Sequence, residues 1–165
     1  MGNVRFEDYH IEVENAIKEK SIAFLYTAVG EIMSQAQRNS RIKSSQTAGS
    51  FKTVVDEQSL TGYVGSDYWN AIYEEFGTGE HATNGDGRKG YWVFVETSEG
   101  PKAPKGGKSY TKEEAKRIMR YLRDKGLNAY YTNGKTANRP LWKAFTSMQS
   151  SIEQLAAEMF GGLGK

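Results

Sequence analysis

The sequence of 165 residues contains no cysteine, only two histidines and only three prolines. The lack of cysteine excludes disulfide frameworks, thiol nucleophiles and cysteine-ligated metal or iron–sulfur centres. His10 and His81 have no second nitrogen ligand at metal spacing, so we expect no metal site and a solvated loop position for His81. No run approaches the ~18 apolar residues of a membrane span, and the polar start MGNVRFEDYH has no apolar signal core. We therefore expect a soluble protein with no membrane partner.

Familiar catalytic motifs are also missing. The run from Gly85 to Gly90 lacks the ending of a phosphate loop, and Asn84 with Asp86 lacks the closing glutamate of a calcium loop. There is no Gly-x-Ser-x-Gly elbow, and nothing marks a cleft around the carboxylates of Asp67, Glu74 and Glu75. We expect no catalytic residue, no cofactor and no enzymatic activity.

The composition is that of an ordinary globular protein, with 38% hydrophobic and 25% charged residues. This length favours a single domain over 1–165, within which an inserted strand–helix–strand region is expected at about 80–136. Charge is unevenly distributed: residues 1–80 carry 12 acidic and 7 basic side chains, whereas residues 81–165 carry 8 and 15. Such a dipolar chain can associate with copies of itself, although chance would produce the same split about as often.

Hydrophobic periodicity predicts an α+β fold. Helices are expected at about 7–38, in a short turn from Ser66 to near Gly77, at 112–125 after the capping box of Thr111 and Glu114, and from Pro140 to Gly161. Strands are expected at 50–55, 59–65, 91–96 and 128–132, and loops at 39–49, 80–88 and 100–108. The expected architecture is a long N-terminal helix, a central antiparallel sheet with a β-hairpin and the insertion, and a C-terminal helix packed on the first helix.

The expected helix at 112–125 carries a basic patch that comprises Lys112, Lys116, Arg117, Arg120 and Arg123. Such a patch can neutralise nucleic-acid phosphates without reading their sequence. Glu113, Glu114 and Asp124 interleave with these bases, so an ordinary solvated helix face is the favoured interpretation.

Two short blocks carry a resemblance to a known family. The first is Tyr73-Glu74-Glu75-Phe76-Gly77-Thr78-Gly79, and the second is Arg139-Pro140-Leu141-Trp142-Lys143-Ala144-Phe145. Their order after a hairpin and at the start of the final helix resembles the tail-completion or head–tail joining proteins of long-tailed phages and prophages. The matching positions are Trp69, Tyr73, Glu75, Phe76, Gly77, Thr78, Pro140, Leu141 and Ala144. Leu141 stands where that family more often has Phe, and residues 80–136 exceed its minimal pattern.

The resemblance implies a non-catalytic virion protein that forms a ring of six copies between the portal or neck and the tail tube. Its implied partners are copies of itself, a neck or head-completion protein, and the tail tube or tail terminator, with DNA passing non-specifically through the lumen. The implied location is the head–tail junction, and the host cytoplasm during assembly. Glu75 is expected to accept backbone hydrogen bonds or to pair with a neighbour's cation, Phe76 to anchor the turn, and Gly77 to permit it.

A head-to-tail ring gives the charge split a use, because the acidic part of one copy can face the basic part of the next. Loops 80–90 and 98–110 and the tail GGLGK are candidates for ordering on contact with neighbours, or are plain surface loops.

Other functions remain open. Residues 90–133 resemble half of a cell-wall-glycan-binding repeat, which predicts a binding module. The basic patch and the abundant aromatic residues equally fit a nucleic-acid-binding domain.

Overall fold

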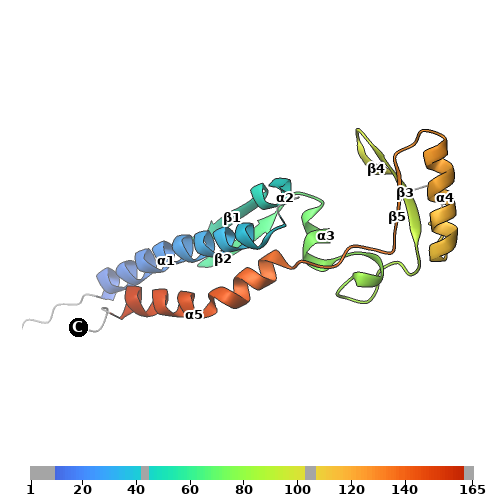
Figure 1. Ribbon diagram of the computed structural model, residues 1–165. Coiled ribbons are helices and arrows are strands. Elements are labelled where there is room, and N and C mark those ends of the chain that lie inside the picture. The colour runs from blue at the N-terminus through green and yellow to red at the C-terminus, as the bar shows by residue number, and fades with distance from the viewer. Residues whose placement is uncertain (1–9, 42–44, 103–106, 162–165) are drawn as a thin grey trace, which may run out of the picture. The chain divides into compact units, whose positions relative to one another are not determined.

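The computed structural model describes residues 10–41, 45–102 and 107–161 and has an α+β fold (Figure 1). Glu7 and Asp8, expected in the first helix, and most of the GGLGK tail lie outside the described residues. The chain divides into two compact units. Unit 1 combines Met1–Asp67 with Pro140–Lys165, and unit 2 is the intervening Tyr68–Arg139, which contains the expected insertion.

Unit 1 is built on the two long helices that the periodicity predicts. Helix α1 (His10–Asn39) packs against α5 (Pro140–Phe160), which confirms the expected pairing. The helices run antiparallel, since the Asn39 side chain donates to the Pro140 carbonyl at 3.2 Å at one end and the Phe24 and Phe160 rings meet edge to face further along.

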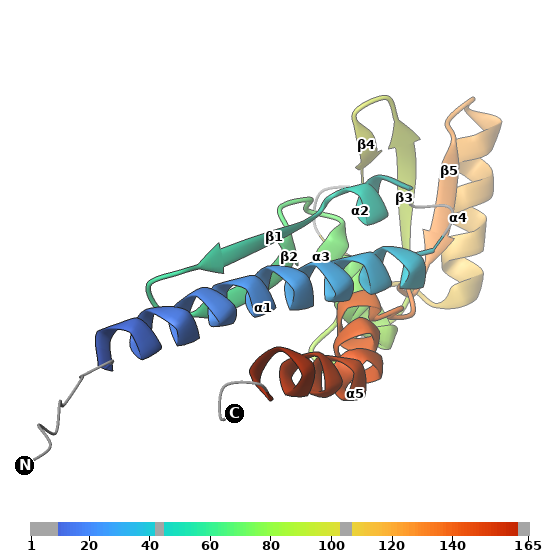
Figure 2. The ribbon, with the colours of Figure 1, turned by 90° about the vertical axis from the view of Figure 1, so that its left-hand side faces the viewer.

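The predicted hairpin lies against α1 (Figure 2). Strand β1 (Phe51–Asp56) pairs antiparallel with β2 (Thr61–Ser66), and the Asp56 carboxylate accepts hydrogen bonds from two turn N–H groups. Gly62 of β2 packs so closely on α1 that a Cβ there would lie 2.5 Å from Val29 Cγ1. The buried side chains of Ala36, Phe51 and Ala144 join α1, the hairpin and α5 in one core.

Unit 2 contains a three-stranded antiparallel sheet with strand order β4-β3-β5. Its strands are β3 (Trp92–Thr97), β4 (Gly100–Lys102) and β5 (Ala129–Thr132). Helix α4 (Lys112–Asp124) covers one face, where Val93, Ala115 and Ala129 form a buried core. The unit begins with α3 (Ala71–Phe76) and the 3-10 turn η2 (Gly79–His81). The capping box of Thr111 and Glu114 is present as predicted.

Four expectations need correction. A five-residue helix, α2 (Ser45–Gly49), lies in the predicted loop 39–49, and β4 lies in the predicted loop 100–108. The strands form two separate sheets where one central sheet was expected. Helix α3 begins at Ala71, because Ser66 belongs to β2, where its hydroxyl contacts that of Ser50 at 2.6 Å.

Candidate functional site

The first block folds with its charged residues inside and its aromatic residues outside. Glu74 is only 1% exposed and Glu75 only 8%, whereas Phe76 is 45% exposed. The expected anchoring of the turn by Phe76 is therefore wrong. Burial of Glu75 also corrects the suggestion that it pairs with a neighbouring copy, because a carboxylate enclosed by its own chain does not reach another.

An ion pair and backbone hydrogen bonds explain how Glu74 can be buried here. Lys135 Nζ lies 2.6 Å from Glu74 Oε1, and the Glu74 carbonyl accepts from the backbone N–H groups of Asn138 and Arg139. Thr78 exchanges hydrogen bonds with Lys135: its N–H donates to the Lys135 carbonyl, and its hydroxyl oxygen accepts from the Lys135 N–H, both at 2.9 Å. The block is thus fastened to residues 133–139, which lie about 60 positions further along the chain.

Gly77 permits the turn, as the sequence predicted, and it also permits this close approach. Its φ is +71°, in the left-handed region that favours glycine. A Cβ at this position would lie 2.5 Å from the His81 carbonyl oxygen and 2.8 Å from that of Lys135. Glycine is therefore favoured at this position both by the positive φ and by the lack of space for a Cβ atom.

Beside this fastened segment lies a concave surface of about 630 Å³, which we call the aromatic groove. Six aromatic residues line it: Trp69, Tyr73, Trp92, Phe94, Tyr130 and Tyr131. The remaining lining residues are mostly small or uncharged: Asn70, Thr78, Pro101, Thr132, Gly134 and Lys135. Trp69 and the first-block residues Tyr73 and Thr78 therefore gather in one place, with residues that the sequence interpretation had not assigned to a site.

Strand alternation places these missed residues. On β3, Val93 and Val95 pack toward α4, so Trp92 and Phe94 take the opposite face of the sheet. Tyr130 lies across from Phe94, and their rings stack at 5.6 Å between centroids. The run YWVFVE held this signal, because β-branched residues alternate with aromatic ones and both strand faces are therefore apolar.

Arginines brace the rings of this face. The Arg88 guanidinium carbon lies 4.9 Å from the Trp92 ring centroid, and that of Arg123 lies 5.3 Å from the Tyr130 centroid. Arg123 also donates from Nε to the Ala129 carbonyl at 2.8 Å. The rings are held in fixed orientations, which reduces the entropy lost when a partner covers them.

The groove offers contact surface and hydrogen bonds to a partner. Its lining contains no carboxylate among the described residues, and Lys135, its only charged member there, is paired with Glu74. The Asn70 amide supplies a neutral donor and acceptor, whereas the hydroxyl groups of Thr78 and Thr132 already make hydrogen bonds within the chain. Concentrated aromatic residues with arginine, and few Glu or Asp, are typical of the energetically important centre of a protein–protein interface.

The second block has a different role. Pro140 and Ala144 are buried and Leu141 packs on the core of unit 1, so these residues hold α5 in place. The neighbouring Trp142 and Phe145 are exposed. The second block, from Pro140 onward, thus belongs to unit 1, where it fills the core and also exposes two aromatic rings, whereas the first block belongs to unit 2.

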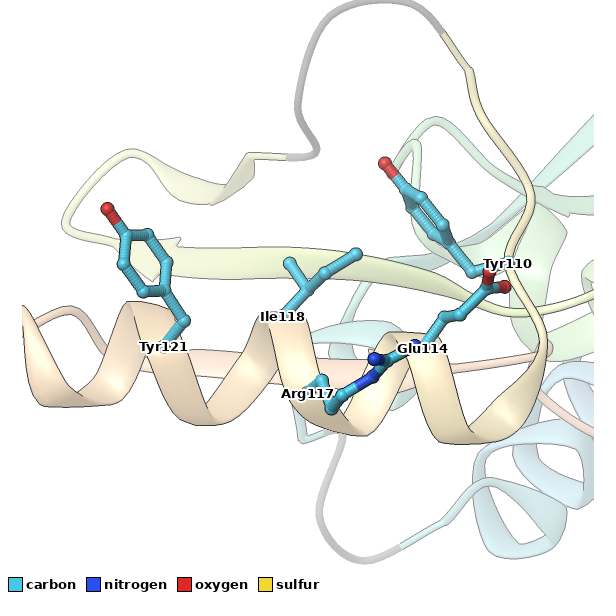
Figure 3. A pocket seen from close by; sticks show the side chains of 5 residues that line it. All are labelled: Tyr110, Glu114, Arg117, Ile118 and Tyr121. Atoms are coloured by element: carbon cyan, nitrogen blue, oxygen red, sulfur yellow. The ribbon is translucent and has the colours of Figure 1, made fainter.

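The residues of the basic patch differ in their exposure and in their contacts. Lys112, Arg117 and Arg120 are exposed on α4, while Lys116 contacts Glu113 at 3.2 Å and Arg123 braces Tyr130. Arg117 lines a shallow hollow on α4, of about 370 Å³, with Tyr110, Glu114, Ile118 and Tyr121. Figure 3 shows Tyr110 and Tyr121 at the two ends of this hollow, with Ile118 between them. Glu114 is already engaged in the capping box.

The Glu80 carboxylate has structural partners within unit 2. The Asn133 side chain and then the Gly90 N–H hold the pKa of the Glu80 carboxyl below its ordinary value. His81 is exposed in η2, as expected.

Within the described ranges, no group of three or more His, Asp or Glu side chains is placed to hold a metal ion. Of the helices the structure describes, none combines the length and the apolar character needed to cross a membrane.

Comparison of the chain with protein-family models, curated proteins and solved structures found no match.

Proposed function

We propose that this protein is a structural component of the head–tail junction of a long-tailed phage or prophage. The observation that carries the proposal is the inverted burial of the first block, which encloses its glutamates and turns aromatic rings toward solvent. A buried aromatic segment needs no partner, whereas an exposed one is suited to contact with another protein. In a joining protein, such exposed rings would form contacts with neighbouring subunits.

In this role the protein forms a ring of six copies between the portal or neck and the tail tube. Its neighbours are the head-completion protein on one side and the tail tube or tail terminator on the other. DNA passes through the lumen without being read. The protein acts without catalysis, first in the bacterial cytoplasm during assembly and then in the virion.

Electron microscopy of particles assembled with and without the protein tests this function directly. We expect separate heads and tails in its absence, and joined particles when the wild-type protein is added back. Normal joining without the protein contradicts the proposal.

A matched pair of variants tests the contribution of the groove. Trp69 and Tyr121 are similarly exposed large aromatic residues, at 60% and 62%, but only Trp69 lines the groove. Trp69→Ala should fail to restore joining, whereas Tyr121→Ala should restore it. Circular dichroism of both variants shows whether the fold is retained.

A binding module for cell-wall glycan is the second candidate. It is favoured by the neutral polar groups beside flat aromatic rings, which suit a sugar. Nucleic acid fits this face less well, because the arginines nearest the rings already stack on them. Retention of the protein on peptidoglycan, lost in Trp69→Ala, would support the glycan alternative.

A further inference from the structure

The first turns of α1 are helical but uncovered. Every residue from 11 to 19 is exposed, including the apolar side chains of Ile11, Val13 and Ile17. Figure 2 shows this end of α1 standing away from α5. Short isolated helices are marginal in water, and most helices in proteins gain their stability from packing of an apolar face. This part of α1 therefore presents an apolar face with no cover from the described part of its own chain.

That face continues the one that packs on α5. Val13, Ile17, Phe24 and Ala28 follow each other at spacings of four, seven and four residues, which places them along one side of a helix. Phe24 contacts Phe160, and Ala28 is buried. The side of α1 that is covered from Phe24 onward is thus bare at Val13 and Ile17, as expected of a helix whose remaining partner belongs to another molecule.

The aromatic groove has the complementary chemistry. Residues 11–19 hold three glutamates and one lysine, so their apolar face is accompanied by net negative charge. Unit 2, which bears the groove, has 13 basic and 9 acidic residues in its sequence, and the described groove lining contains no carboxylate. An apolar, acidic helix and an apolar groove on a basic unit attract each other at long range and exclude water on contact.

We propose that the bare face of α1, centred on Val13 and Ile17, docks into the aromatic groove of a second copy of this chain. The contact joins two different surfaces, so it is heterologous, and every copy retains one free helix end and one free groove. Repetition closes a ring when the rotation between copies permits. The inference rests on the proposed function for its biological setting, but the contact itself is testable without any phage component.

Cysteine cross-linking between two full-length variants tests the contact, since the natural chain contains no cysteine to give a background. One variant carries Ile17→Cys on the bare face and the other carries Pro101→Cys at the exposed edge of the groove. The matched controls are Asn15→Cys, on the opposite side of the same helix end, and Tyr121→Cys, on α4 outside the groove. Equal mixtures are oxidised mildly, and the disulfide-linked dimers are identified by mass spectrometry.

We expect the pair I17C with P101C to cross-link about tenfold faster than N15C with P101C or I17C with Y121C, because a disulfide needs Cα atoms within about 7 Å and docking raises their local concentration. Equal rates for all pairs would overturn the proposal. An excess of I17C homodimers would also overturn it, since it would show the helix ends pairing with each other.

A second experiment addresses loss of folding and separates the two proposals. Val13→Asp with Ile17→Asp should abolish self-association in sedimentation while leaving the circular dichroism unchanged, and Asn15→Asp should preserve both. If these aspartates leave self-association intact, the docking contact is wrong. If they abolish it but phage heads and tails join normally without the protein, only the proposed function fails.

Discussion

At the residue scale, two glycines have nearly the same φ and differ in their surroundings. Gly77 and Gly85 have φ values of +71° and +73°, but a Cβ would collide with carbonyl oxygens at Gly77 and meet nothing within 4 Å at Gly85. We expect Gly85→Ala to cost about 1 kcal/mol of unfolding free energy from backbone strain alone. Gly77→Ala should cost about 3 kcal/mol or more, because the steric conflict adds to that strain. Urea unfolding of both variants measures the difference, and equal losses would contradict the packing described at Gly77.

Glu80 links stability to pH. Its pKa is lowered from the ordinary 4.5 chiefly by the Asn133 side chain, so the fold favours the charged carboxylate. The resulting stabilisation is complete at pH values above the ordinary pKa and is lost as the pH falls through the lowered one. Glu80→Gln should therefore flatten the dependence of the urea midpoint on pH below about 4.5, where the wild type loses stability. Glu153→Gln, on the exposed surface of α5, serves as the control and should retain the slope of the wild type.

The sequence predicted the local backbone requirements of the first block better than it predicted which of its side chains are buried. The need for glycine at position 77 follows from a turn that ends a helix, which is a local property. The burial of Glu74 depends on Lys135 and Asn138, which approach only after the chain has folded. A helix-ending Glu-Phe pair normally buries the Phe, and no nearby residue signals the reverse.

At the element scale, α4 shows how much one terminus contributes. The Thr111 hydroxyl accepts from the Glu114 N–H at 3.3 Å, and the Glu114 carboxylate accepts from the Thr111 N–H at 2.8 Å. Thr111→Ala should cost about 1 kcal/mol, because an N–H at the start of the helix loses its acceptor. Thr111→Ser retains the acceptor and should cost much less. Thermal unfolding of the two variants checks this, and similar losses would mean that the threonine methyl group matters more than its hydroxyl.

The sequence predicted those elements whose own residues form a recognisable pattern. The capping box marked α4, proline marked the start of α5, and the alternation of Val with aromatic residues marked β3. Helix α2 has only five residues, too few to show a period, and β4 contains Pro101 and exists through its pairing with β3. The groove was missed for a similar reason: Trp92, Phe94 and Tyr130 looked like core residues until the sheet acquired one covered face and one open face.

At the scale of the whole molecule, the uneven charge of the chain bears on assembly. Unit 2 has four more basic than acidic residues, and unit 1 has two more acidic than basic ones. Contact between copies through these units should weaken as salt rises, since the Debye length falls from about 10 Å at 0.1 M to about 3 Å at 1 M. Sedimentation over this range measures the effect. Association that is unchanged in molar salt would mean that apolar contact alone holds the copies together.

The division of the chain into two units also bears on the order in which its parts can fold during synthesis. Unit 2 is one continuous segment, whereas unit 1 needs α5 to complete the core of α1 and the hairpin. All of Tyr68–Arg139 leaves the ribosome before Pro140 does, so unit 2 can fold while Ala36 and Phe51 still await Ala144. Helix α1 is thus synthesised first but packs against its partner helix α5 last. Until α5 emerges, the nascent chain exposes the apolar side chains of α1 and the hairpin that α5 later covers.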